Sequence, residues 1–275
     1  MKITNNQYKS LQLLEIHNPL SSLVLSLYGG QVLSWIPASD KRERLFLSDK
    51  AVLDASKSIR GGIPVCWPWF GAHPDKVNYP AHGYVRNRLW NPESQRQDND
   101  CTTLVLVPES TEGPGFAGQA SLHLEIIAGT ELCLNLVTSN EGKAAFPLSC
   151  ALHTYFSVSD INNTALEGLH GVYSDKTRNW QHFPTPSHYN FHEETDRIHL
   201  VAAAETSIVE PRGKTHIVSC GHDSIVVWNP WADCARNFAD MSADGFRHML
   251  CVETALTQGR MLEPGETHTL TQRIS

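Results

Sequence analysis

Five short stretches of the chain combine ionisable side chains with apolar neighbours, a mixture typical of binding and catalytic sites. The first is SIRGGIPVCWPWFG, residues 58–71, in which Arg60 precedes two glycines and a stiff run of prolines and aromatic residues. The glycines allow positive φ angles and let a ligand or another strand approach the backbone closely. Aromatic faces beside a guanidinium suit a ligand that is apolar on one face and carries hydroxyl or anionic groups, such as a sugar ring. The alternative is a loop that packs its aromatics into the core, with Arg60 in a salt bridge.

The second stretch, AHGYVRNRLW at residues 81–90, holds His82, Arg86 and Arg88. In an extended segment the i, i+2 spacing would place both arginines on one face, whereas in a turn it need not. Taken alone, the stretch would be a solvated basic patch.

The other three stretches could supply acid–base chemistry. LHTYFSVSD, residues 152–160, places His153 in an apolar, aromatic run, where a lone histidine is often a hydrogen-bonded core residue. CVETAL, residues 251–256, places Glu253 in the middle of an expected strand, where a carboxylate is costly to bury unless it is paired or functional. A raised pKa, close to neutral, is what a general base needs. FHEETDR, residues 191–197, by itself predicts only a polar loop.

The elements that must position these residues are mainly β-strands. Apolar residues alternate in 122–127 and again in 132–137, and the short gap with a glycine between them predicts a hairpin. Further strands are predicted at 21–29, 31–37, 102–108, 147–158, 215–220, 224–230, 248–256 and 268–274. Helical signals are few and short, so the pattern predicts an all-β antiparallel sandwich or barrel. The long connections 60–80 and 231–247 are where a site would be built.

Composition narrows the function further. The 275 residues carry a net charge of −7 and show no internal repeat or linker, so a single domain over residues 1–275 is expected. The acidic balance argues against a nucleic-acid partner but not against a small anion bound by a few local arginines. The N-terminus lacks a secretory pattern and no apolar run could span a membrane, which predicts a cytoplasmic protein without a membrane partner. Seven cysteines without a CxxC spacing predict buried, reduced thiols.

Six motifs together resemble a known family. IRGGIPVCWPWFG, AHGYVRNRLW, LHTYFSVSDI, ETD, VVWNPW and CVETA occur in the order seen in the hexose-6-phosphate mutarotases, or glucose-6-phosphate 1-epimerases, of the aldose 1-epimerase superfamily. The resemblance runs from SLYGGQVLSW, residues 26–35, to near the C-terminus. It implies a large antiparallel β-sandwich of the galactose mutarotase-like type, with a groove for one sugar ring. It also implies a small-molecule sugar phosphate as partner and no cofactor or metal, and a monomer is expected.

The resemblance assigns catalytic roles to two residues, with His153 as general acid and Glu253 as general base. The base would remove the proton of the C1 hydroxyl while the acid protonates the ring oxygen, O5. The C1–O5 bond then opens, rotation about C1–C2 presents the other face, and the ring closes as the other anomer. For this His153 should be largely imidazolium, which a neighbouring carboxylate would favour. Asp196 could be that carboxylate, or it could hold a sugar hydroxyl.

The resemblance also implies the substrate contacts. Arg60 and Arg86 match arginines that contact the substrate, and they would receive the 6-phosphate, with Arg88 as a further candidate. His82 matches a histidine that faces the sugar. Ala81 stands where some members carry a substrate-binding glutamine, so that contact is absent or comes from another residue.

Other functions stay open at this point. One is an aldose 1-epimerase acting on an unphosphorylated sugar, and another is a carbohydrate-binding protein without turnover, although the acid–base pair favours catalysis. A zinc hydrolase is suggested by fourteen histidines, with His182, His188 and His192 close together, but neither HExxH nor CxxC accompanies them.

Overall fold

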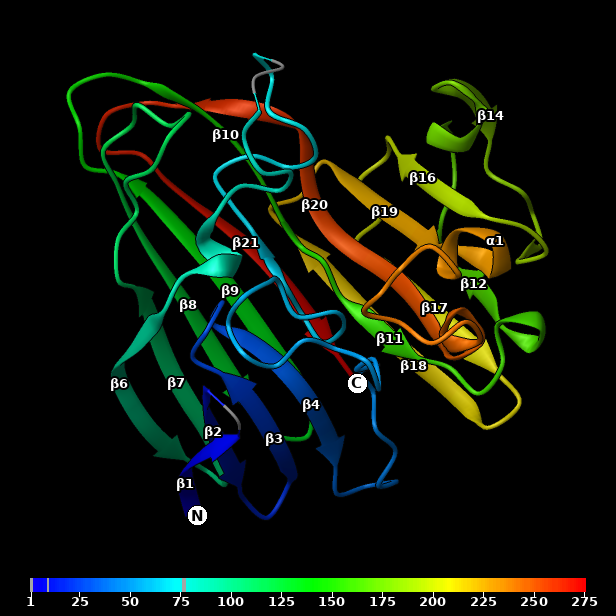
Figure 1. Ribbon diagram of the computed structural model, residues 1–275, viewed down its shortest axis with the longest axis horizontal. Coiled ribbons are helices and arrows are strands. Elements are labelled where there is room, and N and C mark those ends of the chain that lie inside the picture. Colours follow the sequence, from blue (N-terminus) through cyan, green and yellow to red (C-terminus); the bar gives the residue numbers. More distant parts are fainter. Residues whose placement is uncertain (1, 9, 76–77) are drawn as a thin grey trace.

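Three antiparallel sheets make up most of the computed structural model, which describes residues 2–8, 10–75 and 78–275 (Figure 1). The four-stranded sheet has the order β1 (Lys2–Tyr8), β2 (Leu11–His17), β3 (Ser21–Ser26), β4 (Gln31–Pro37). The eight-stranded sheet has the order β14 (Gln181–Pro184), β13 (Val172–Asp175), β16 (Thr195–His199), β19 (Ser224–Asn229), β20 (Met249–Leu262), β10 (Phe146–Leu152), β5 (Val65–Cys66), with β11 (Tyr155–Ser157) also on β20. The nine-stranded sheet has the order β15 (Tyr189–Asn190), β12 (Ala165–Glu167), β17 (Glu205–Glu210), β18 (Gly213–Cys220), β21 (Thr267–Ile274), β9 (Leu132–Asn140), β8 (Ala120–Ala128), β7 (Cys101–Pro108), β6 (Trp90–Asp98).

Helix is scarce, as the sequence predicts. The helical elements of the described residues are α1 (Trp231–Ala235) and the 3-10 turns η1 (Val85–Asn87), η2 (Ile161–Asn163), η3 (Lys176–Arg178) and η4 (Gly245–His248). None of the helices in the described ranges has the length and apolar character needed to span a membrane.

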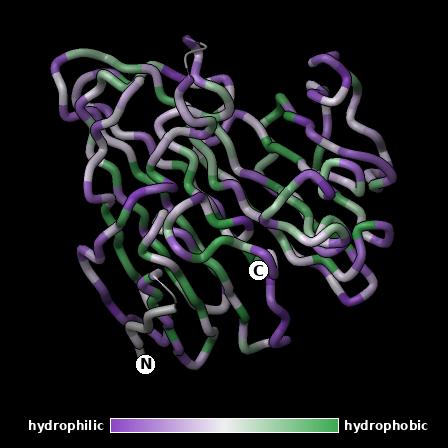
Figure 2. Tube along the Cα trace, in the orientation of Figure 1, coloured by the Kyte–Doolittle hydropathy of each residue, from purple (hydrophilic) through white to green (hydrophobic). Residues whose placement is uncertain are grey.

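Alternating apolar residues form the core, and the predicted hairpin of β8 and β9 is confirmed. Leu124 and Ile126 of β8 pair with Leu136 and Leu134 of β9, and all four side chains are buried. Figure 2 shows hydrophobic residues concentrated along the strands and hydrophilic residues in the outer loops. This two-residue period lets each strand bury one face while the other stays polar.

The seven cysteines are free, as expected, but their burial is uneven. Cys66, Cys150 and Cys251 are buried, whereas Cys220 is exposed. Cys133 is only partly buried, because it lies on the face of β9 opposite to the buried leucines.

The glycines after Arg60 let neighbouring backbone segments of the protein pack closely, and that backbone, not a ligand, fills the space that a Cβ would take. Gly61 and Gly62 have φ angles of 121° and 61°. A Cβ on Gly61 would lie 2.4 Å from the carbonyl oxygen of Phe46, and one on Gly62 would lie 2.2 Å from that of Val32. The backbone N–H of Gly62 donates to the Phe46 carbonyl at 2.7 Å. The tight approach fixes the backbone that carries Arg60.

Two aromatic residues of the same loop pack inward. Trp67 is fully buried and its Nε1 donates to Oγ1 of Thr138, while Trp69 is buried and donates to the carbonyl of Pro80. They belong to the core, and of the loop's aromatic residues Phe70 lines the pocket described below.

Replacing Gly62 by alanine is expected to lower the free energy of unfolding by about 3 kcal/mol or more, since a left-handed φ and a backbone overlap are combined. Gly265→Ala is the matched control, because Gly265 has a φ of 79° but nothing within 4 Å of its added Cβ. The control should lose only about 1–2 kcal/mol. Urea unfolding of the two variants measures this, and equal losses would contradict the packing argument.

Candidate active site

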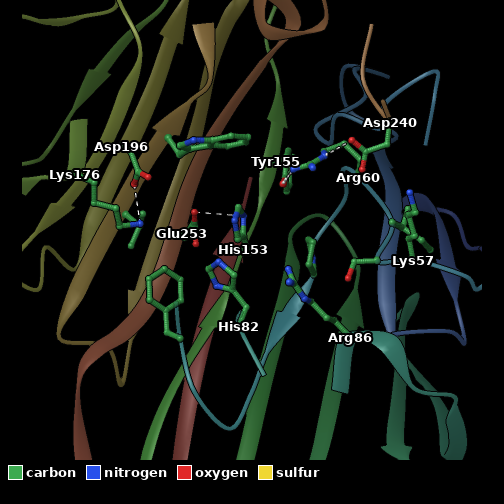
Figure 3. A pocket seen from close by; sticks show the side chains of 16 residues that line it. Lys57, Arg60, His82, Arg86, His153, Tyr155, Lys176, Asp196, Asp240 and Glu253 are labelled. Carbon is green, nitrogen blue, oxygen red and sulfur yellow. Dashed lines mark hydrogen bonds and ion pairs between the residues drawn. The ribbon is translucent and has the colours of Figure 1, made fainter. Parts of the chain in front are cut away.

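A pocket of about 440 Å³ gathers most of the ionisable residues singled out above (Figure 3). Its charged and ionisable lining residues are Lys57, Arg60, His82, Arg86, His153, Tyr155, Lys176, Asp196, Asp240 and Glu253. All six residues predicted as site residues are among them. Loops, η1, η3 and the strands β16, β19 and β20 contribute to the wall, so segments far apart in sequence meet there.

His153 and Glu253 form a buried pair at the centre of the pocket. Glu253 lies in β20 opposite Val226 of β19, and its side chain is 2% exposed. His153 lies between β10 and β11, where its backbone N–H donates to the carbonyl of Pro64. Nδ1 of His153 is 3.4 Å from Oε1 of Glu253. This Nδ1 and the second oxygen of Glu253 are buried without a hydrogen-bond partner among the described residues, which is costly unless a ligand supplies one.

Burial sets the protonation of this pair. Desolvation raises the pKa of Glu253 well above its ordinary 4.5, against the opposing effect of Lys176. Desolvation also lowers the pKa of His153 well below 6.5, and His82 and Arg86 lower it further. Both shifts favour the uncharged forms, a carboxylic acid at Glu253 and a neutral imidazole at His153. They oppose the imidazolium form that the mechanism expects of His153.

Aromatic rings hold His153 in place. The ring of Tyr155 is stacked on it, with centroids 5.0 Å apart and planes 10° apart, and Trp228 meets it edge-on at 6.2 Å. The hydroxyl of Tyr155 accepts a hydrogen bond from Nη1 of Arg60 at 3.2 Å. Tyr155 therefore links the histidine to one of the two predicted arginines.

His82 is held as a neutral donor facing the pocket. Its backbone N–H donates to the carbonyl of Gly71, and its Nδ1 accepts from the N–H of Gly71 at 3.3 Å. An accepting Nδ1 leaves the hydrogen of the neutral ring on Nε2. Burial, then Arg86 and Lys176, lower the pKa of His82 to about 3.

Arg60 and Arg86 lie together on one side of the pair (Figure 3). Nε of Arg60 is 3.3 Å from Oδ1 of Asp240, and its guanidinium lies 4.5 Å from the ring centroid of Phe238. Nη2 of Arg86 donates to the carbonyl of Ala81 at 2.8 Å, while its Nε is buried without a partner. Within the described residues Arg86 has no carboxylate partner. At the position of the family's glutamine, Ala81 thus offers its carbonyl to Arg86.

Arg88 does not join this group. Its Nη1 donates to the carbonyl of Ser110 at 2.8 Å, and its guanidinium packs 4.3 Å from the ring centroid of Tyr84. Arg86 lies within the turn η1 and Arg88 follows at its C-cap, so the same-face rule, which holds only for an extended segment, does not apply.

Asp196 lines the pocket but does not pair with His153. Its Oδ1 is 2.9 Å from Nζ of Lys176, a residue that the sequence did not single out. Asp240 was also missed, although it lies in the connection 231–247 where a site was expected. The suggestion that Asp196 holds His153 as imidazolium is therefore wrong, while a role in holding a sugar hydroxyl stays open.

The histidines that suggested zinc lie elsewhere. His182, His188 and His192 are exposed and do not line the pocket. Within the described part of the chain, the group of potential metal ligands that comes together is His153, Cys251 and Glu253, with ligand atoms within 4.8 Å of one another. A hydrolytic zinc site built on the three exposed histidines is therefore not supported.

Comparisons with known proteins identify the class of fold and then the family. A galactose mutarotase-like protein from Clostridium acetobutylicum has the same fold, with a TM-score of 0.75 at 14% identity over 100% of this chain and 98% of its own. A sequence model of the Aldose 1-epimerase family matches residues 12–275, and the chain belongs to that family.

Relatives of higher identity carry a more specific name. Proteins from Escherichia coli K12 and Cenchrus ciliaris, both named "Putative glucose-6-phosphate 1-epimerase", are 31% and 34% identical. The alignments cover 92% and 87% of this chain and 86% and 77% of theirs. A crystal structure titled as a "putative mutarotase" from Salmonella typhimurium matches with a TM-score of 0.91 and 27% identity over 99% of this chain and 92% of that one. Family membership supports an epimerase that acts on a sugar.

The His82 ring is expected to stay neutral as the pH falls from 6.5 until it nears 3. Since a histidine of the unfolded chain binds its proton near pH 6.5, this group lowers the free energy of unfolding as the pH drops through that window. NMR of ring-labelled histidine follows the titration. Arg86→Gln should raise the pKa of His82 by removing a nearby cation, and titration of the wild-type ring near 6.5 would contradict the assignment.

Proposed function

We propose that the protein interconverts the α and β anomers of a hexose 6-phosphate, with glucose 6-phosphate as the first substrate to test. The observation that carries the proposal is the surplus of positive charge in the pocket. Four cationic side chains, Lys57, Arg60, Arg86 and Lys176, face three carboxyl groups there. A phosphate monoester carries about −1.5 to −2 charges at pH 7. In a chain of net charge −7, this local excess suits an anionic sugar.

Two of these cations are available to a phosphate. Arg86 and Lys57 have no carboxylate partner in residues 2–8, 10–75 and 78–275, whereas Arg60 and Lys176 are each paired with an aspartate. Nη1 of Arg60 donates to the phenol oxygen of Tyr155 and pairs with no carboxylate among the described residues. Guanidinium groups bind phosphate oxygens through parallel hydrogen bonds, so Arg86 suits this role, with Arg60 beside it as a further donor.

The order of atoms in the sugar agrees with this arrangement. In a hexopyranose C6 is attached to C5, which is bonded to O5, and O5 is bonded to C1. With His153 at O5 and Glu253 at the C1 hydroxyl, the 6-phosphate extends beyond His153, away from Glu253. Figure 3 shows Arg60, Arg86 and Lys57 on that side.

Ring opening takes two proton transfers, and their net effect is to move one proton from His153 to Glu253. From carboxylate and imidazolium, Glu253 takes the proton of the C1 hydroxyl as His153 gives its proton to O5, and the C1–O5 bond breaks to leave the free aldehyde. The pair is then a neutral carboxylic acid and a neutral imidazole, the state that burial favours here. After rotation about C1–C2, the same transfers in reverse close the ring on the other face.

The phosphate also contributes to this chemistry. After burial and His82, the positive charges of Arg86 and Arg60 are among the causes that lower the pKa of His153. A phosphate dianion bound to the two arginines offsets that effect, so imidazolium forms more readily when the substrate is phosphorylated. Phosphorylated sugars should therefore have a higher kcat as well as a lower KM than unphosphorylated sugars.

Replacing Glu253 by glutamine should lower kcat for glucose 6-phosphate about 10²- to 10⁴-fold, the usual contribution of one acid–base group. Two-dimensional exchange NMR at anomeric equilibrium measures the rate above the spontaneous one. Glu167→Gln is the control, since Glu167 pairs with Lys214 at the surface. An unchanged rate in Glu253→Gln would remove this residue from the mechanism.

Arg86→Gln should lower kcat/KM for glucose 6-phosphate about 10- to 100-fold, because a charged hydrogen bond contributes about 1.5–3 kcal/mol. Arg88→Gln changes the neighbouring arginine that lies outside the pocket and should stay within about twofold of wild type. Free glucose, tested in parallel, should respond little to either change. A wild-type enzyme that turns over free glucose as well as its 6-phosphate would instead support an epimerase of unphosphorylated sugars.

A further inference from the structure

We propose that Lys176, paired with Asp196, is a specificity-determining residue that recognises the 2-hydroxyl of the sugar. The inference rests on the proposed function and extends it to the end of the pocket opposite the phosphate. Lys176 lies in η3, directly after β13, and Asp196 lies in the neighbouring strand β16. Their side chains are 25% and 23% exposed, and both line the pocket.

The position of the pair follows from the ring of the substrate. C1 is bonded to O5 on one side and to C2 on the other. Since His153 is assigned to O5 and Glu253 to the C1 hydroxyl, C2 lies beyond Glu253, on the side away from the arginines. Figure 3 shows Lys176 and Asp196 on that side of Glu253. The 2-hydroxyl is therefore the substituent that reaches them.

The chemistry of the pair matches a hydroxyl group. A hydroxyl both donates and accepts hydrogen bonds, and an ammonium beside a carboxylate offers one donor and one acceptor. The ammonium has three N–H donors, and the pair with Asp196 at 2.9 Å engages one oxygen of that carboxylate. Groups built to bind a hydroxyl discriminate against a substrate that lacks it, because they are left without a partner in a partly buried site.

The surroundings hold Lys176 in this position. Its Nζ lies 5.7 Å from the ring centroid of Phe70 and 5.6 Å from that of Trp180, within the range of cation–π contact. Trp180 is 57% exposed and has a φ of 62°, and the preceding Asn179 has a φ of 55°. These two successive residues in the left-handed region form the turn that places an exposed tryptophan against this lysine. Backbone strain at non-glycine residues of this kind is often found at ligand sites.

The test compares glucose 6-phosphate with 2-deoxyglucose 6-phosphate, each measured above its own spontaneous rate by exchange NMR. Wild type should favour the 2-hydroxyl sugar about 10- to 100-fold in kcat/KM, as a charged hydrogen bond predicts. In Lys176→Met this preference should fall to about threefold or less, because activity on glucose 6-phosphate falls much more than activity on the 2-deoxy sugar. Both sugars share any smaller loss that comes from removing a cation near Glu253. Lys176→Arg should restore a large part of the preference.

Controls separate recognition from folding. Lys214→Met removes a lysine that pairs with Glu167 at 2.8 Å outside the pocket, and this variant should keep the wild-type preference. Asp196→Asn, which keeps the shape of the side chain, is the second variant should Lys176→Met fold poorly, and it should also reduce the preference. Equal losses on both sugars in Lys176→Met, or no preference in wild type, would overturn the proposal.

Failure of the proposed function gives a different result. If wild type accelerates the exchange of no sugar, the same two phosphates are compared by calorimetric binding. Tighter binding of glucose 6-phosphate in wild type, lost in Lys176→Met, would support recognition of the 2-hydroxyl without turnover. Equal binding of the two sugars would reject it.

Discussion

The burial of an ionisable pair without full hydrogen bonding is the constraint around which this pocket is organised. Burial leaves little water to solvate a charge on Glu253 or His153, which favours a carboxylic acid and a neutral imidazole over the ion pair. A core of this kind would normally exclude such groups or satisfy them fully. Polar atoms without a hydrogen-bond partner are acceptable in a site where a ligand supplies the partner. A reacting sugar offers a hydroxyl and a ring oxygen for that purpose.

The fold meets this constraint by holding Glu253 and His153 through separate contacts. Glu253 is set by the pairing of β20 with β19, and His153 is set by the stacking of Tyr155 and the hydrogen bond to Pro64. The close backbone packing at Gly61 and Gly62 fixes Arg60 at one end of the pocket, where Arg86 and Lys57 also lie. The pair of Lys176 and Asp196 closes the other end. Under the proposed function, the cations at one end would face the 6-phosphate, and the lysine–aspartate pair at the other end would face the 2-hydroxyl.

Much of this arrangement could be predicted from sequence, because strands with one buried face leave a regular pattern. The hairpin of β8 and β9 follows from the alternation of apolar residues. The six residues that the motifs predicted for the site all line the pocket. Strand β6 was missed, because it lies at the edge of its sheet and eight of its nine residues are exposed, so no apolar alternation marks it.

Contacts between distant segments could not be predicted. Arg60 meets Asp240 across 180 positions, and Lys176 reaches Asp196 only because β13 and β16 are neighbours. The protonation of His153 likewise depends on burial and on cations from other loops, which motif spacing does not encode. Arg86 and Arg88 diverge because Arg86 lies within a 3-10 turn and Arg88 follows it in extended conformation.

Anomer exchange of glucose 6-phosphate at equilibrium, followed by two-dimensional NMR with the wild-type protein, tests the central claim most directly. The account predicts exchange between the α and β C1 signals at a rate that rises in proportion to protein concentration, and much slower exchange for free glucose under the same conditions. Exchange that stays at the spontaneous rate for every sugar, although the sugars bind, would contradict it and leave a carbohydrate-binding protein on this scaffold.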